Sequence, residues 1–262
     1  MNLDEIKYCP GTLASGHTTY SRGCLKNMFS GKKVNHVLPY EHPQQSEDVA
    51  GQFMENRKHI SISGVQEKLS FILDKNILRL TKEGEQGTYI LKPIPRDLKQ
   101  VDQLPANEHL TMQIAKQVYG INTAENAMIF FRNGAPAYIT KRFDVKNDGG
   151  KWGKEDFASL AGKTNDNAGV NFKYEYSYEE VGMLIQKFVP AWRVEIEKYF
   201  SLVVFNFLFS NGDAHIKNFS LLESSKGDYL LSPAYDLIKV CLQMISKVKN
   251  IKKEDTLQKL IL

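Results

Sequence analysis

The sequence of 262 residues is poor in cysteine, with only three, at positions 9, 24 and 241. So few thiols exclude a disulfide framework of the kind that stabilises small secreted domains, and we expect a protein of a reducing compartment. Cys9, His17 and Cys24 could supply three zinc ligands, but the paired C-x-x-C spacing of a strong zinc motif is missing. We therefore do not expect a zinc site.

Long apolar runs are also lacking. The longest, from Tyr199 to Phe209, is interrupted by Ser201 and Asn206 and falls short of the roughly 20 residues that a membrane helix needs. We expect a buried core helix there and no membrane partner. Residues 1–5 have neither the basic start nor the apolar centre of a secretory signal, so we expect a cytoplasmic protein, or one delivered from the cytoplasm into a target cell.

The sequence has no large excess of charge of one sign. Its 34 basic and 30 acidic residues leave a net charge of +4, which neither requires nor excludes a nucleic-acid partner. The lysine-rich segment 246–262 is typical of a solvated helix face, and we expect no direct contact with nucleic acid. With 42% hydrophobic residues, a chain of this length can bury a core as one unit or as two lobes that share a cleft.

The order of the predicted elements divides the chain into three parts. Residues 1–59 are rich in turn formers, with one short helix expected over residues 47–58. Residues 60–144 alternate short β-rich runs with turns, which predicts an antiparallel sheet. Its expected strands are residues 69–73, 77–80, 88–92, 127–131 and 137–140.

One helix is predicted within the sheet part and several after it. Pro105 opens the first and Gly120 ends it, with Leu110, Ile114 and residues 117–118 along one face. Residues 145–262 are predominantly helical, and the helices expected there are residues 155–160, 178–188 and 195–210. A strand-rich lobe with one helix, followed by a helical lobe, predicts the α+β, two-lobed fold of protein kinases.

The most informative residues lie in the second lobe, in the segment 211–218 and shortly after it. Asp213 is followed five positions later by Asn218, and Asp236 comes after a predicted hairpin of residues 219–222 and 229–232. Phosphoryl transfer from ATP uses this order, because the first carboxylate can orient an acceptor hydroxyl while the amide and the second carboxylate hold magnesium. A single D-x-x-x-x-N is weak evidence, since Asp and Asn often serve as turn formers.

Three further features precede that segment in the order of a kinase. Residues 61–68, with Gly64 and Lys68, can approach phosphates, although a loop with one glycine is alone more typical of an ordinary turn. Lys92 ends a strand, and Glu108 in the next helix can pair with it as the strand lysine and helix glutamate of kinases do. The alternatives are an edge lysine and an acid that favours the helix N-terminus.

The segment 137–144 falls where the two lobes join. Its exposed main chain could contact the edge of an adenine, and Phe143 could cover the face of the same base. The alternative interpretation of this segment is an ordinary strand end. His215 and Lys217 could contact phosphates or serve only local packing. Each feature has a structural alternative, but their occurrence together in kinase order favours a kinase.

Several of these motifs together resemble the HipA family of bacterial toxin kinases. They cover about residues 60–238, and the serine pair and short N-terminal part are most similar to the compact HipT members. The motifs are S-I-S-G-V-Q-E-K at 61–68, I-L-K-P at 90–93, N-E at 107–108, K-R-F-D at 141–144, E-D-F at 155–157, N-G-D-A-H-I-K-N-F-S at 211–220 and Y-D-L at 235–237.

The resemblance implies a role for each matching residue. It implies that Asp213 is catalytic, that Asn218 and Asp236 hold Mg²⁺, and that Lys92, paired with Glu108, binds ATP phosphates. Ser63, Gly64, Val65, Gln66 and Lys68 would form the phosphate loop, Lys141 and Phe143 would lie at the adenine, and His215 would lie near the nucleotide.

The resemblance also implies regulation and partners. Ser61 and Ser63 correspond to serines that family members autophosphorylate, and a phosphate of about −1.5 to −2 charge beside ATP disfavours nucleotide binding. Family members phosphorylate a serine of an aminoacyl-tRNA synthetase, halt translation and are restrained by a DNA-binding, HipB-like antitoxin. A small N-lobe-like partner protein is a further expectation from the HipT members.

The C-terminal part departs from the family pattern, because HipA-like chains usually continue well beyond the Tyr-Asp motif. We therefore expect a shortened C-lobe. The leading hypothesis is an ATP- and Mg²⁺-dependent protein serine/threonine kinase. The alternatives are a catalytically impaired nucleotide-binding module that acts through an antitoxin, and a small-molecule or lipid kinase.

Overall fold

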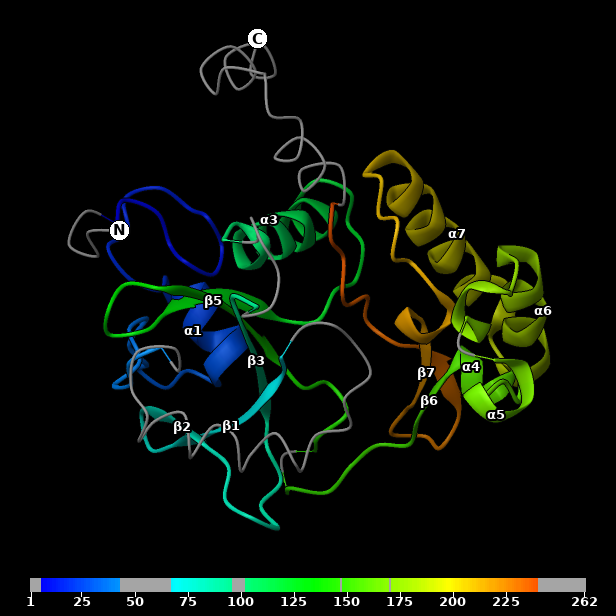
Figure 1. Ribbon diagram of the computed structural model, residues 1–262, viewed down its shortest axis with the longest axis horizontal. Coiled ribbons are helices and arrows are strands. Elements are labelled where there is room, and N and C mark those ends of the chain that lie inside the picture. Colours follow the sequence, from blue (N-terminus) through cyan, green and yellow to red (C-terminus); the bar gives the residue numbers. More distant parts are fainter. Residues whose placement is uncertain (1–5, 43–66, 96–101, 147, 170, 240–262) are drawn as a thin grey trace, which may run out of the picture.

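The computed structural model describes residues 6–42, 67–95, 102–146, 148–169 and 171–239, and all structural statements concern these residues. They form a sheet lobe and a mainly helical lobe side by side (Figure 1). This arrangement is the predicted α+β, two-lobed fold. The helix expected over residues 47–58 lies outside the described residues.

The sheet lobe contains five strands in the order β2-β1-β3-β5-β4, and each neighbouring pair is antiparallel. Each predicted strand of this lobe is present within one or two residues, because turn formers separate runs whose side chains alternate between two covered faces. The strands are β1 (Leu69–Asp74), β2 (Ile77–Leu80), β3 (Tyr89–Pro93), β4 (Asn126–Phe130) and β5 (Pro136–Lys141).

Two helices cover the two faces of this sheet (Figure 1). Helix α1 (Arg22–Phe29) packs with Leu91 and Ile139 on one face, and α3 (Leu104–Gln117) packs with Tyr138 on the other. The segment 6–42, expected to be loop-rich, contains α1 and pairs with strand β4 through hydrogen bonds such as Leu38 N to Phe130 O at 2.8 Å. It therefore belongs to the core of the sheet lobe.

The predicted apolar face of α3 is wrong in part, although Ile114 packs against the core as expected. Leu110 is 45% exposed and Val118, just after the helix, is 71% exposed, whereas His109 and Gln113 are buried. Polar groups share the buried side of α3 with Met112 and Ala115. They can be buried because they pair with Asn126 of β4, whose side-chain oxygen contacts His109 Nδ1 at 2.8 Å and accepts from Gln113 at 3.1 Å. Buried polar groups that satisfy one another cost little, so apolar spacing alone misplaces this face.

The second lobe combines helices with a small antiparallel sheet of order β6-β7-β8. The prediction for residues 178–188 is confirmed, and Ser177 and Glu180 form a capping box at that helix. The elements are β6 (Lys154–Asp156), α4 (Phe157–Leu160), α5 (Asn165–Ala168), the 3₁₀ turn η2 (Phe172–Tyr174), α6 (Tyr178–Phe188), α7 (Trp192–Leu208), the 3₁₀ turn η3 (Ile216–Asn218), β7 (Ser220–Glu223) and β8 (Tyr229–Leu231).

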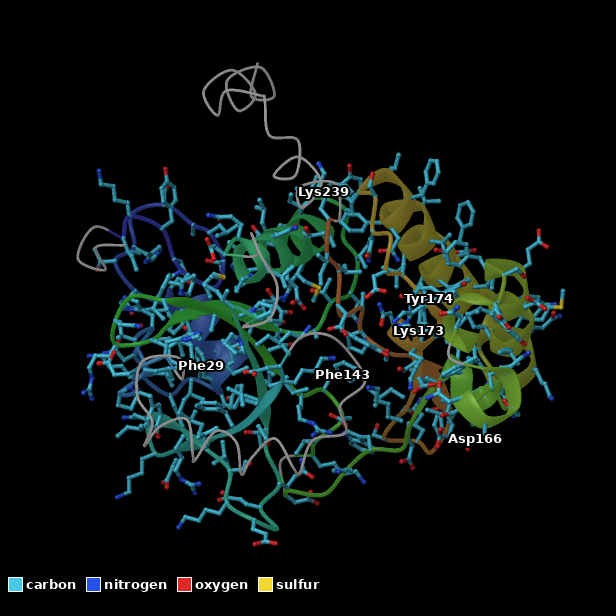
Figure 2. All side chains as sticks on the ribbon, viewed as in Figure 1. Phe29, Phe143, Asp166, Lys173, Tyr174 and Lys239 are labelled. Carbon is cyan, nitrogen blue, oxygen red and sulfur yellow. The ribbon has the colours of Figure 1, made fainter. Side chains whose placement is uncertain are left out.

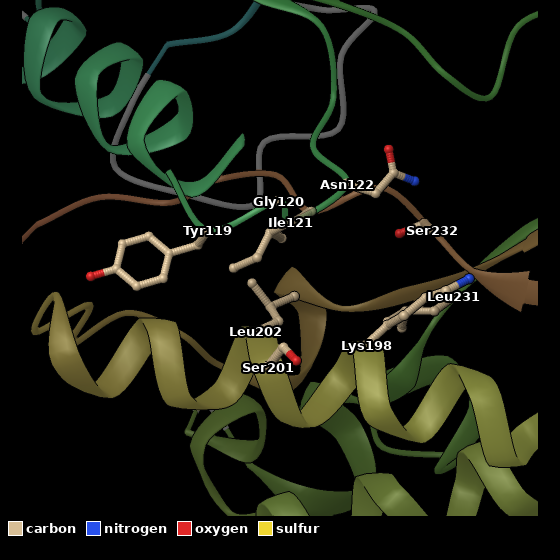
Figure 3. Close-up of a pocket in the computed structure, with 10 residues that line it drawn as sticks. Tyr119, Gly120, Ile121, Asn122, Lys198, Ser201, Leu202, Leu231 and Ser232 are labelled. Atoms are coloured by element: carbon tan, nitrogen blue, oxygen red, sulfur yellow. The ribbon is translucent and has the colours of Figure 1, made fainter. Parts of the chain in front are cut away.

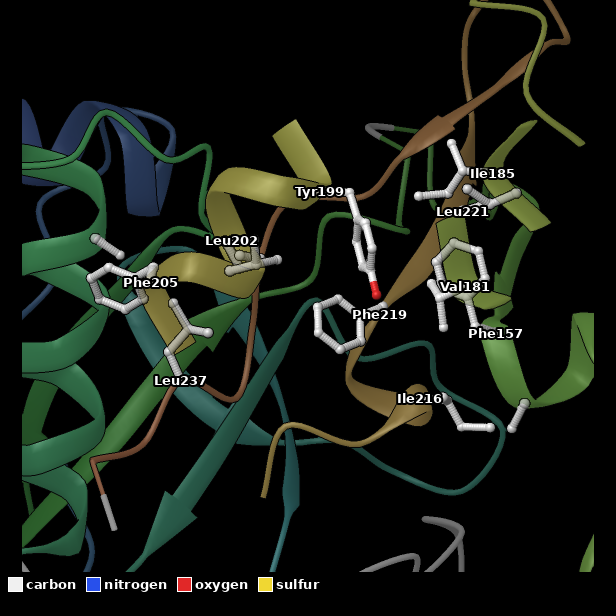
Figure 4. Packing of buried hydrophobic residues seen from close by; sticks show 14 of the residues in the cluster. Phe157, Val181, Ile185, Tyr199, Leu202, Phe205, Ile216, Phe219, Leu221 and Leu237 are labelled. Atoms are coloured by element: carbon white, nitrogen blue, oxygen red, sulfur yellow. The ribbon is translucent and has the colours of Figure 1, made fainter. Parts of the chain in front are cut away.

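Two helix predictions in this lobe need correction. The helix expected over residues 155–160 begins only at Phe157, because Glu155 and Asp156 pair with β7 and Asp156 caps the helix. The apolar run in α7 is not buried all round: Tyr199 and Phe205 lie in the core (Figure 4), while Phe200 is 67% and Phe207 83% exposed. No described helix combines the length and apolarity that crossing a membrane requires.

The two lobes are joined by main-chain pairing as well as by the connecting chain. Residues Thr123 and Ala234 form a parallel bridge, with Ala124 N donating to Ala234 O at 2.9 Å and Ala234 N to Asn122 O at 2.8 Å. Near the end of the described chain, Asn107 Nδ2 of α3 donates to Lys239 O at 2.8 Å. These contacts hold the segment 234–239 beneath α3 and thereby position Asp236.

Candidate active site

Four charged side chains from different parts of the sequence form a cluster between the lobes. Lys92 Nζ of β3 lies 2.6 Å from Glu108 Oε1 of α3 and 2.5 Å from Asp236 Oδ1 of the second lobe. Lys68 Nζ, just before β1, lies 3.5 Å from Asp236 Oδ2. The side chains of Lys92 and Glu108 are 3% and 0% exposed, whereas that of Asp236 is 25% exposed.

Burial and mutual charge set the protonation of this cluster. Burial by itself lowers the pKa of Lys92, but the carboxylates of Asp236 and Glu108 raise it above its ordinary value. Burial disfavours a charged Asp236, yet Lys92 and Lys68 hold its pKa well below the usual range. Burial raises the pKa of Glu108 despite its contact with Lys92. The cluster therefore presents a fixed ammonium group and an ionised, partly accessible carboxylate.

Asp236 has a special backbone conformation. Its φ is +56°, in the left-handed region that non-glycine residues adopt at some energetic cost. The preceding residue is anchored, because the Tyr235 hydroxyl donates to Lys217 O at 3.0 Å and contacts the Ser220 hydroxyl. The surrounding contacts thus impose a backbone that turns the carboxylate towards Lys92.

The segment after α7 carries the predicted catalytic residues. Asn211, the first residue of the segment 211–218, is 7% exposed and donates from Nδ2 to Asn206 Oδ1 of α7 at 3.0 Å. At the other end Ile216 and Phe219 are each 3% exposed and belong to the core of the second lobe. Asn218 Nδ2 donates to Asp213 O at 2.7 Å, which closes the segment into a compact loop. The carboxylate of Asp213 remains 55% exposed.

His215 connects Asp213 with the charged cluster electrostatically. Its Nε2 lies 3.8 Å from Asp213 Oδ1. Burial lowers the pKa of His215, and the negative charges of Asp213 and Asp236 partly oppose this effect. The carboxylates of Asp213 and Asp236 both affect the pKa of His215, and Tyr235 donates a hydrogen bond to Lys217, the residue before Asn218. The predicted catalytic and magnesium-binding residues therefore lie in one region.

The predicted adenine residues are placed differently from one another. Phe143 lies between the lobes (Figure 2), with its ring centroid 5.8 Å from that of Tyr235. Lys141, by contrast, extends from the other face of the sheet to α1, where Nζ lies 3.4 Å from Asn27 O. Successive strand side chains alternate between faces, so Lys141 cannot share the face of Tyr138 and its partner Lys92. The Lys141 ammonium group is not brought into the site.

The predicted phosphate loop lies mostly outside the described residues. Ser61, Ser63, Gly64, Val65 and Gln66 belong to that part. Of the residues predicted there, Lys68 is described, and its contact with Asp236 brings the end of the loop to the charged cluster. The roles of the other five residues stay predictions.

The residues present fit Mg²⁺ and a nucleotide. Asp236 and Asn218 offer a carboxylate and an amide oxygen, hard ligands of the kind that magnesium takes together with substrate phosphates. Buried side-chain atoms without a hydrogen-bond partner in the described part of the chain also remain near the site, namely Glu108 Oε2 and His215 Nδ1. In that part no three His, Cys, Asp or Glu side chains form a metal cluster; Cys9 Sγ instead accepts from Ser21 N at 3.1 Å.

A separate cavity of about 190 Å³ is lined by no residue of the charged cluster. Figure 3 shows residues that line it. The loop after α3, helix α7 and the chain after β8 line it with residues such as Ile121, Leu202 and Ser232. Neither Lys92 nor Asp213 borders this cavity. Its lining carries no acid, so nothing in it suits a metal-bound phosphate.

Sequence reasoning missed one residue that touches the predicted catalytic aspartate. The Tyr174 hydroxyl donates to Asp213 Oδ1 at 2.7 Å, and its ring lies edge-on to His215 with centroids 5.4 Å apart. Tyr174 belongs to the isolated turn η2, 39 residues before Asp213, and no spacing or motif links the two. The Y-D-L motif at 235–237 did not indicate the anchoring role of Tyr235, which depends on its contacts with Lys217 and Ser220.

Comparison with known proteins gives consistent matches. Residues 60–259 match the family model described as the HipA-like C-terminal domain. A putative kinase of Haemophilus influenzae is 28% identical over 246 residues, which cover 92% of this chain and 69% of the relative. The putative kinase Y4dM of Sinorhizobium fredii is 30% identical over 229 residues, which cover 82% of this chain and 51% of the relative.

A solved structure agrees with these relatives in fold. It is the complex of HipA, HipB and operator DNA from the toxin–antitoxin system of Shewanella oneidensis MR-1, matched with a TM-score of 0.56 and 25% identity. The match covers 70% of this chain and 44% of the other. This chain thus spans about half of the Sinorhizobium relative and less than half of the matched structure.

Proposed function

This chain belongs to the HipA-like C-terminal domain family, and we propose on that basis that it is an ATP- and Mg²⁺-dependent protein kinase that phosphorylates serine. The observation that carries the proposal is that Lys92 Nζ lies within 2.6 Å of a carboxylate oxygen of Glu108 and of Asp236, between the lobes. A strand lysine, a helix glutamate and a metal-binding aspartate are the parts that kinases use to hold a triphosphate.

Each residue of the site has a task in this proposal. Glu108 keeps Lys92 charged and directed at the interlobe space, where the ammonium group binds phosphate oxygens. Asp236 and Asn218 hold Mg²⁺, which supplies positive charge against the phosphates. Asp213 orients the acceptor hydroxyl and takes its proton as the hydroxyl oxygen bonds to the γ-phosphorus and ADP leaves.

Asp213 is supported in this role by its position. Its carboxylate is exposed to an incoming hydroxyl, while its main chain is fixed by Asn218 at 2.7 Å. An aspartate on a fixed loop can select the orientation of an acceptor even when its basicity is low, since positioning contributes more than proton affinity in this reaction.

The experiment that tests the proposal is phosphoryl transfer from γ-labelled ATP with Mg²⁺, measured for the natural sequence and for Asp213→Asn. We expect Asp213→Asn to lower the transfer rate by about 10²–10⁴-fold, the range of a positioned general base. Asp166→Asn is the matched control, because Asp166 is an exposed acid on α5 of the same lobe, and its rate should be unchanged. Equal rates for the natural sequence and Asp213→Asn would refute the role of Asp213.

The finer parts of the proposal concern substrate, partners and regulation. We propose an aminoacyl-tRNA synthetase as target, inhibition of translation as outcome and a cytoplasmic location. A HipB-like antitoxin is the proposed restraint, supported by the HipB in the matched Shewanella complex. Autophosphorylation of Ser61 or Ser63 is the proposed off switch, because a phosphate there repels the phosphates of ATP.

A second candidate is a nucleotide-binding module without turnover. This candidate predicts that Mg²⁺–ATP binds but that no labelled phosphate is transferred, even when Ser61 and Ser63 are both replaced by alanine. Measurable transfer by that double variant would exclude it.

A further inference from the structure

The Tyr174 hydroxyl contacts the carboxylate to which the proposed function assigns the acceptor hydroxyl. It donates to Asp213 Oδ1 at 2.7 Å, the length of a hydrogen bond from a hydroxyl to a carboxylate. A serine hydroxyl oriented by the same carboxylate must make the same kind of bond. One carboxylate oxygen is thus already engaged by a group that chemically resembles the substrate.

The turn that carries Tyr174 has a firm base and an exposed end. Phe172 of η2 is 7% exposed and packs into the core of the second lobe, whereas Tyr174 is 53% exposed. Figure 2 shows Tyr174 and Lys173 on the side of the helical lobe that faces the sheet lobe. The Tyr174 ring also rests edge-on against His215, with centroids 5.4 Å apart. The ring can therefore leave Asp213 by side-chain rotation without disturbing the core.

The electrostatics of the contact keep the Tyr174 phenol a hydrogen-bond donor. The hydrogen bond to Asp213 raises the pKa of Tyr174 to about 12, and burial adds to this effect. At neutral pH the phenol is therefore protonated and remains a hydrogen-bond donor. An acceptor hydroxyl that approaches the same Oδ1 would compete with this donor.

We propose that Tyr174 is an intramolecular competitor of the acceptor hydroxyl, an autoinhibitory contact that a bound protein substrate must displace. The inference rests on the proposed function of Asp213 and adds a residue that no catalytic motif contains. Replacement of the phenol by a phenyl ring leaves a space the size of a hydroxyl beside Asp213, which a water molecule or a substrate serine can enter.

The test is the hydrolysis of Mg²⁺–ATP, in which water serves as the acceptor. We expect Tyr174→Phe to hydrolyse ATP about three- to tenfold faster than the natural sequence. Loss of a surface hydrogen bond to a charged group changes the equilibrium between the blocked and the open Asp213 carboxylate by up to about one order of magnitude. Tyr178→Phe is the matched control. Tyr178 is a 45% exposed tyrosine of α6 whose hydroxyl lies 3.5 Å from Ala214 O and does not contact the Asp213 carboxylate.

A spectroscopic measurement tests the contact independently of activity. In a titration of tyrosine absorbance, the phenol that disappears in Tyr174→Phe should have a pKa of about 12 in the natural sequence. Asp213→Asn should return it towards the model-peptide value of about 10. An unchanged titration in Asp213→Asn would overturn the proposed contact.

The outcomes separate this inference from the proposed function. If Mg²⁺–ATP does not bind in calorimetry, the proposed function fails. If it binds but Tyr174→Phe is no faster than Tyr178→Phe, the competitor role alone is refuted. Phosphate found on Tyr174 by mass spectrometry would also refute it, since Tyr174 would then be an acceptor. Faster hydrolysis by Tyr174→Phe alone, abolished by adding Asp213→Asn, supports it.

Discussion

Replacement of Lys92 by methionine tests the charged cluster through stability, without any assay of activity. Methionine keeps much of the volume of the lysine stem but removes the ammonium group. Glu108 is 0% exposed and lies 2.6 Å from Lys92 Nζ, so the replacement leaves a buried carboxylate without its cation. Asp236 keeps Lys68 at 3.5 Å and is more exposed, so Glu108 dominates the effect.

The magnitude follows from two estimates that agree. Removing one partner of a buried ion pair typically costs about 3–5 kcal/mol. The carboxylate can escape this cost by taking a proton, and at pH 7 protonation of a glutamate of ordinary pKa 4.5 costs roughly 3 kcal/mol, at about 1.4 kcal/mol per pKa unit. We therefore expect Lys92→Met to lower the free energy of unfolding by about 3 kcal/mol at pH 7.

The sign of the pH dependence follows from the raised pKa of Glu108. Burial raises this pKa in the folded state, so the folded state binds the proton more tightly than the unfolded state. The stability that protonated Glu108 contributes is full below the pKa of this group in the unfolded state, and it is lost as the pH rises through its pKa in the folded state. The deficit of Lys92→Met should accordingly shrink to about 1 kcal/mol at pH 5.

The assay is urea unfolding of four proteins at pH 7 and pH 5. Lys92→Met is compared with the natural sequence, with Lys92→Met/Glu108→Gln and with Lys116→Met. The last is the matched control, because Lys116 pairs with Glu125 at the surface, where the two side chains are 33% and 35% exposed. Such a pair contributes only about 0–1 kcal/mol. The added Glu108→Gln should recover part of the loss at pH 7 and remove its pH dependence.

Three results would refute the reasoning. The first is a loss in Lys92→Met no larger than in Lys116→Met. The second is a loss in Lys92→Met that does not change between pH 7 and pH 5. The third is a double variant less stable at pH 7 than Lys92→Met, since removal of the buried charge should relieve the penalty.

Two further predictions concern pH and modification. Burial lowers the pKa of His109 to about 4, so the stability that neutral His109 contributes is full above about pH 6.5 and is lost as the pH falls towards 4. Between these pH values, the free energy of unfolding of His109→Gln should change by up to roughly 3 kcal/mol less than that of the natural sequence. An equal change in both proteins would contradict this. Autophosphorylation should place phosphate on Ser61 or Ser63 when the active protein is incubated with Mg²⁺–ATP. Mass spectrometry that finds both peptides unmodified, in a preparation with measurable transfer, would count against the proposed off switch.

Local patterns in the sequence were sufficient for much of the architecture. Helix α6 begins at Tyr178 and ends at Phe188 as predicted, because its capping box and apolar spacing are both local signals. The hairpin of β7 and β8 formed about the predicted turn for the same reason. The order of Lys92, Glu108, Asp213, Asn218 and Asp236 along the chain indicated a kinase-like site before any contact was known.

Long-range packing decided what local patterns could not. His109 and Gln113 of α3 can be buried because their side chains meet Asn126 of β4. Lys141 was predicted at the adenine, but the sheet register turns its ammonium group towards α1. Part of α7 is exposed although its sequence is apolar, since a helix buries only the face that another element covers.

The tertiary structure also determines two contacts between residues that are remote in the chain. Lys92 contacts Asp236, 144 residues away, and Tyr174 contacts Asp213, 39 residues away. The sequence by itself determined which chemical groups the protein carries and their order, because residue types and local spacing are written in it directly. Their distances, their burial and therefore their charges were decided only when the two lobes packed together, since those quantities depend on neighbours that are remote in the chain.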